Sequence, residues 1–109
     1  MYFITTFQRL QKDNKGWLDF GNERTVGYFH SLEDCQKRVI SNACDLCETI
    51  YHYAVIQELE EDCFYPIAKY QELYQVKDIV DERGFYNFNL TYEQIKIPEW
   101  FPLYGLNIG

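Results

Sequence analysis

The sequence has few of the residues that build dedicated chemical sites. Its 109 residues include six glycines, two histidines and one methionine. It has no glycine-rich phosphate loop, no His-Glu-x-x-His zinc motif and no Gly-x-Ser-x-Gly nucleophile motif. We therefore assign no catalytic residue, no metal and no cofactor from the sequence, and we expect a protein that is not an enzyme.

Long hydrophobic runs are also missing. The opening residues, Met1 to Phe7, alternate as a strand does and lack the basic start and longer apolar core of a signal peptide. No window approaches the roughly 20 apolar residues of a membrane span. These features predict a cytoplasmic protein that does not bind membranes.

Positive charge is scarce. Ten lysines and arginines face 17 aspartates and glutamates, which gives a formal net charge of −7. Such a charge repels nucleic-acid phosphates, so we expect no direct binding to nucleic acid. A protein partner with a basic surface suits this negative charge better than nucleic acid does.

Aromatic residues, by contrast, are abundant: ten tyrosines, eight phenylalanines and two tryptophans. One sheet face backed by a helix cannot bury all of them, and exposed aromatics beside acidic groups are typical of protein interfaces. An acidic run, Glu58 to Asp62, stands at a predicted turn. The predicted partner-binding residues are Trp17, Phe20, Glu58, Glu60, Glu61, Asp62 and Trp100.

The order of predicted elements indicates a single α+β domain over residues 1–109. Strands are expected at residues 2–10, 24–30, 51–60, 64–77 and 85–90, and the apolar tail after Pro102 is expected to dock as a short last strand. One helix lies between the second and third strands. The pattern predicts a mostly antiparallel sheet of five or six strands with the helix packed on one face.

The helix has a clear start signal. Ser31 is a good N-cap, and Asp34 follows where a capping box places its carboxylate. An apolar stripe at helical spacing continues the pattern to about residue 50. Its members are Leu32, Cys35, Val39, Ala43, Leu46 and Ile50.

The cysteines raise the question of a metal or redox site. On that helix Cys35 and Cys47 fall toward the core, whereas Cys44 falls among charged neighbours, so the three thiols cannot converge on one ion. Packing of Cys35 and Cys47, with Cys44 as a surface thiol, is the main interpretation. A zinc site or a Cys–His enzyme, drawing on Cys63, His30 or His52, remains an alternative.

Several segments resemble a family of short uncharacterised proteins from Gram-positive gut bacteria and their mobile elements. They are Met1–Phe7, Gly16–Gly21, Arg24–Tyr28, Ser31–Cys35 and Tyr53–Ile56. The resemblance covers about the first 70 residues, and the family has no assigned activity, so it implies no site residue. In size, charge and lack of motifs the chain is similar to anti-CRISPR proteins.

The leading hypothesis is a small acidic interaction protein without enzymatic activity. In its sharpest form it inhibits a nucleic-acid-handling host defence enzyme on behalf of a mobile element. The alternatives are a protein that binds or sequesters a small planar ligand of nucleotide type, and a cysteine- or zinc-dependent enzyme.

Overall fold

A computed structural model describes residues 1–60 and 66–106 of the protein. Within these residues it has one α-helix and seven β-strands. The strands are β1 (Tyr2–Phe7), β2 (Gln11–Lys12), β3 (Leu18–Asp19), β4 (Glu23–Phe29), β5 (Tyr53–Leu59), β6 (Ala68–Lys77) and β7 (Thr91–Ile95), and the helix is α1 (Leu32–Ile40).

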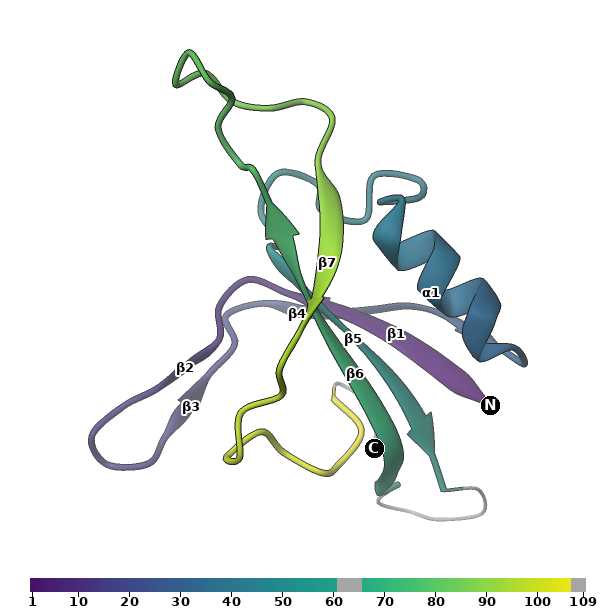
Figure 1. Cartoon of the computed structure of the whole chain (residues 1–109). Coiled ribbons are helices and arrows are strands. Elements are labelled where there is room, and N and C mark those ends of the chain that lie inside the picture. The colour runs from purple at the N-terminus through teal and green to yellow at the C-terminus, as the bar shows by residue number, and fades with distance from the viewer. Residues whose placement is uncertain (61–65, 107–109) are drawn as a thin grey trace.

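Five of the described strands form one antiparallel sheet in the order β4-β1-β5-β6-β7. Helix α1 contacts β1, β4, β5 and β7, so it covers one face of this sheet (Figure 1). The predicted α+β class and the antiparallel sheet with one helix on one face are therefore confirmed. No helix among the described residues is long and apolar enough to cross a membrane.

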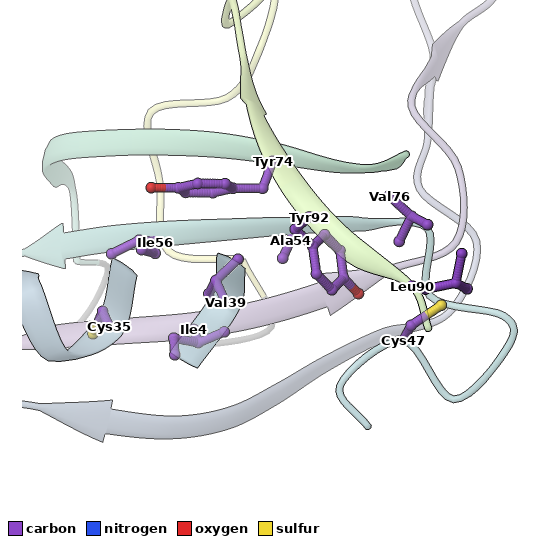
Figure 2. Packing of buried hydrophobic residues seen from close by; sticks show 10 residues of the cluster. All are labelled: Ile4, Cys35, Val39, Cys47, Ala54, Ile56, Tyr74, Val76, Leu90 and Tyr92. Atoms are coloured by element: carbon purple, nitrogen blue, oxygen red, sulfur yellow. The ribbon is translucent and has the colours of Figure 1, made fainter. Parts of the chain in front are cut away.

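The helix-facing core joins α1 to the centre of the sheet. Cys35 and Val39 point from α1 toward Ile4 of β1 and Ile56 of β5 (Figure 2). At the other end of the cluster Cys47, which follows the helix, lies with Leu90 (Figure 2). This core therefore ties the segment after the helix to the segment that leads into β7.

The opposite face of the sheet has a second core, rich in aromatic rings. Phe7 stacks on Tyr53 with centroids 5.5 Å apart and meets Phe20 edge-on at 5.2 Å. Phe101 and Leu106 from the tail complete the cluster. The sheet is thus covered on both faces, by the helix on one and by irregular chain on the other.

The tail was predicted to add a last short strand. In the part that is described, it makes a single bridge between Ile67 and Tyr104, beside a hydrogen bond from the Ala68 amide to the Leu103 carbonyl. It does dock on the sheet, at the start of β6. Residues 107–109 of the predicted strand lie outside the described residues.

The helix starts as predicted but ends earlier. The Ser31 hydroxyl accepts a hydrogen bond from the Asp34 amide at 3.2 Å, as an N-cap does. Asn42 then adopts φ 52°, and the amides of Asn42 and Ala43 donate to the carbonyls of Val39 and Arg38. These two bonds are those of a Schellman C-cap, with asparagine in the left-handed position. The prediction that the helix continues to about Ile50 is wrong for this reason.

The strand predicted at residues 85–90 is also wrong, since β7 starts only at Thr91. Asn87 explains the difference. Its side-chain nitrogen donates to the Asp78 carbonyl, and its side-chain oxygen accepts from the Asn89 amide. Side-chain bonds of this kind compete with the pairing of a regular strand.

Candidate functional site

Residues 78–90, which we call the β6–β7 loop, extend away from the sheet and leave the molecule elongated, at 49 × 37 × 21 Å (Figure 1). A turn at Asp81 holds its far end. The Asp81 carboxylate accepts hydrogen bonds from the amides of Arg83 and Phe85 and pairs with the Arg83 guanidinium at 3.1 Å. The bond from the Phe85 amide, together with the contacts from Arg83, holds the pKa of Asp81 below its ordinary value. The loop is therefore an organised structure, although it is not a regular hairpin.

The β6–β7 loop exposes apolar side chains. Val80 is 59% exposed, Phe85 64% and Phe88 87%. The Phe88 ring meets the Tyr86 ring nearly at a right angle, 69°, with centroids 5.1 Å apart. Single exposed apolar residues are ordinary, but three on one projecting loop suggest a contact surface. We call Val80, Phe85 and Phe88 the apolar tip.

Acidic groups accompany the apolar tip. Asp78 and Glu82 lie on the same loop and are exposed, while Asp81 is paired with Arg83. The loop therefore carries three carboxylates against one guanidinium. An apolar centre with a polar, charged surround is the usual arrangement of a protein interface.

A cavity of about 460 Å³ lies at the base of the loop. One wall comes from the turns that follow α1, and the other from the end of the β6–β7 loop. Residues that line it include Asn42, Asp45, Thr49, Tyr86, Phe88 and Asn89. The size falls in the range of small-molecule sites, about 300 to 1,000 Å³.

The turns after α1 are tightly held. The Asn42 side-chain oxygen accepts from the Cys47 amide at 2.9 Å, and the Arg24 guanidinium pairs with Glu48 at 2.7 Å. Arg24 also lies over the Tyr51 ring at 4.9 Å, and the Tyr51 carbonyl accepts from the Tyr92 hydroxyl at 2.6 Å. These contacts fix the first wall of the cavity against the sheet.

The predicted partner-binding residues do not form one site. Trp17 is 72% exposed and lies between β2 and β3, and Glu58 and Glu60 lie at the end of β5, away from that hairpin (Figure 1). Trp100 is half-buried and packs against the second core. Glu61 and Asp62 lie outside the described residues.

Phe20 requires a correction as a surface residue. Only 5% of it is exposed, because its ring packs between Phe7 and Phe101 in the second core. It therefore stabilises the base of the β2–β3 hairpin. We leave it out of the candidate surface.

The cysteines pack as the main interpretation predicted. Cys35 and Cys47 are completely buried in the helix-facing core, and Cys44 is exposed. Burial raises the pKa of Cys35 to about 11 and also raises that of Cys47. Among the described residues no three of the side chains His, Cys, Asp and Glu gather as a metal site would require. Cys63 lies outside these residues.

One buried carboxylate was missed by sequence reasoning. Glu72 of β6 is 5% exposed and accepts hydrogen bonds from Gln36 of α1, from Tyr70 at 2.5 Å and from Tyr74 at 2.8 Å. Burial alone would raise its pKa, but the three donors together outweigh burial and hold the pKa below its ordinary value. All its donors are neutral groups of the helix–sheet interface, so we interpret Glu72 as structural.

Three of the missed residues could have been found from the sequence. Asn42 is an asparagine that follows the last turn of a helix, which is a recognised stop signal. Phe85 and Phe88 directly follow a turn signal, Asp81 to Gly84. The helical apolar stripe was given more weight at Asn42, and strand-like composition at residues 85–90. Glu72 has no such signal, because its burial depends on which strand face meets the helix.

No family model, curated protein or solved structure matches the chain. The resemblance to short proteins of gut bacteria and mobile elements therefore stays a prediction. The functional argument depends on the site itself.

Proposed function

We propose that this chain is a non-enzymatic interaction protein that binds a protein partner through the apolar tip of the β6–β7 loop. The observation that supports this most is the exposure of Val80, Phe85 and Phe88 on a loop held by the Asp81 turn. A loop that is already organised loses little further conformational freedom on binding.

The charge around the tip indicates the chemistry of the partner. The acidic side chains of Asp78 and Glu82 and the net charge of −7 favour a partner whose apolar groove is surrounded by lysine or arginine. Proteins that handle nucleic acid present such basic surfaces. Inhibition of a nucleic-acid-handling defence enzyme, as an anti-CRISPR protein does, is the form of this function that we favour.

The test is affinity capture from host lysate with three versions of the tagged protein. They are the unchanged chain, the double variant Val80→Ser/Phe85→Ser, and the control Trp17→Ser, which removes an exposed aromatic from the β2–β3 hairpin. We expect a nucleic-acid-handling protein to be retained by the unchanged chain and the control, and to be lost at least tenfold with the double variant. Truncation of central interface aromatics costs at least 2 kcal/mol, which corresponds to about a 30-fold loss of affinity.

Two controls accompany the capture experiment: a salt series and a check that the double variant is folded. Capture should weaken between about 50 and 500 mM salt if charge steers the encounter. Circular dichroism must show that the double variant is folded. Equal retention of every captured protein by the double variant and the unchanged chain would contradict the proposal.

A further inference from the structure

The cavity at the base of the β6–β7 loop has a one-sided charge. Asp45 is exposed at its edge and has no ion-pair partner among the described residues, whereas neighbouring Glu48 is paired with Arg24. No lysine, arginine or histidine of the described chain lines the cavity. An anionic ligand such as a phosphate would therefore meet a carboxylate and no countercharge.

Two aromatic rings complete the lining. Tyr86 and Phe88 stand at 69° to each other with centroids 5.1 Å apart, so their rings form a corner in the part of the lining that comes from the β6–β7 loop. The face of an aromatic ring attracts a cation that lies within about 6 Å of its centre. A lining that combines a carboxylate with an aromatic corner suits a group that is positively charged and flat.

Apart from Leu90, neutral hydrogen-bonding groups make up the rest of the lining. They come from Asn42, Thr49 and Asn89, together with the hydroxyls of Ser41 and Thr91. Guanidinium carries five donors in a planar fork and stacks on aromatic faces, whereas ammonium is a compact charge that holds its water more strongly. The lining therefore fits arginine better than lysine.

The backbone supports this assignment. Asp45 has φ 54° and Thr49 has φ 64°, which is unusual for a β-branched residue. Residues held in such sparsely populated conformations cluster at ligand sites. Here three residues with positive φ, Asn42, Asp45 and Thr49, lie on one wall of the cavity.

We infer that this cavity binds an arginine side chain supplied by the protein partner, with the guanidinium between the Asp45 carboxylate and the rings of Tyr86 and Phe88. The inference rests on the proposed function, since it names what the partner inserts beside the apolar tip. It also explains why an acidic protein would carry a cavity with a single unpaired carboxylate.

The test needs no partner. N-acetyl-arginine amide is titrated into the ¹⁵N-labelled protein, and N-acetyl-citrulline amide, its neutral isostere, serves as the ligand control. We expect the arginine probe to shift the amides of Asn42, Asn89 and Thr91 with a Kd of about 1 mM, and the citrulline probe to bind at least about tenfold more weakly.

Two matched variants test whether the Asp45 carboxylate is the group that binds the arginine probe. Asp45→Asn should weaken the arginine probe at least fivefold. Asp34→Asn should leave its Kd unchanged, because Asp34 is also an exposed aspartate but lies on α1, outside this cavity. Asparagine tolerates positive φ as aspartate does, so Asp45→Asn does not strain the backbone.

Three results would overturn the inference: equal binding of arginine and citrulline, equal effects of the two variants, or tighter binding of an uncharged base such as adenosine. The last would favour the small-ligand hypothesis. If partner capture depends on Val80 and Phe85 but the arginine probe does not bind the cavity, the inference fails and the proposed function stands. If the arginine probe binds the cavity but partner capture does not depend on the apolar tip, the cation site stands and the proposed function fails.

Discussion

Replacement of Glu72 by glutamine should destabilise the protein by about 2 to 4 kcal/mol at pH 7. The carboxylate is buried and accepts from Gln36, Tyr70 and Tyr74 over distances of 2.5 to 3.0 Å. Hydrogen bonds to a charged group contribute about 1.5 to 3 kcal/mol each. Glutamine keeps one acceptor oxygen and replaces the other by an NH2 group, from which a tyrosine hydroxyl can accept but the Gln36 NH2 cannot. The bonds that remain are between neutral groups, which contribute about 1 kcal/mol less each, and the loss is partly offset because a neutral side chain is easier to bury.

The same variant should change how stability depends on pH. The folded-state pKa of Glu72 lies below its ordinary value of 4.5, so the unfolded chain takes up the proton first as the pH falls. The stabilisation from this group is complete above the unfolded pKa and is lost as the pH falls through the folded pKa. The difference between the unchanged protein and Glu72→Gln should therefore be largest at neutral pH and should narrow toward pH 3.

Urea unfolding followed by tryptophan fluorescence between pH 3 and 7 measures both effects. Glu33→Gln is the control, because Glu33 is an exposed glutamate whose ion pair, with Lys37, lies along the same helix. It should leave the unfolding midpoint nearly unchanged. Two results would refute the view that a charged Glu72 holds the helix to the sheet. One is a loss of less than about 0.5 kcal/mol in the free energy of unfolding of Glu72→Gln. The other is a difference in this free energy between the variant and the unchanged protein that stays constant with pH.

Two further predictions concern the segment after the helix and its thiols. Asn42→Ala should lower the free energy of unfolding, measured with urea, by about 2 kcal/mol. Asn42→Gly should lower it by about half as much, because glycine keeps the left-handed C-cap and loses only the bond to the Cys47 amide. Equal losses for the two variants would contradict the assigned cap. In a Cys63→Ser background, a thiol reagent should modify Cys44 of the native protein at once, and Cys35 and Cys47 only after unfolding. Fast reaction of two or three thiols in the native state would show that the helix-facing core is open.

Local patterns predicted the sheet well where successive side chains of a strand alternate between its two faces. Alternation in the strand predicted at residues 51–60 puts Val55 on one face and Ile56 on the other, and the structure places them in separate cores. The Ser31 cap likewise located the start of α1. These features depend on neighbouring residues, so the sequence contains them.

Features that depend on long-range contact were not predictable in the same way. Phe20 looked like an exposed loop aromatic, and only its approach to Phe7 and Phe101 buries it. Trp17, three residues earlier, remains exposed. Glu72 reads as an ordinary strand glutamate until α1 brings Gln36 to it.

The two failed pattern predictions lie in the same place. The helix that ends at Ile40 instead of continuing, and the strand that is absent at residues 85–90, supply the two walls of the cavity. In both, an asparagine replaces regular pairing by side-chain bonds to the backbone, Asn42 in one wall and Asn87 next to the other. Departures from local pattern are expected where a fold serves a function instead of its own stability. This coincidence is an argument for the cavity and the apolar tip as one functional surface, and it is independent of their charge and exposure.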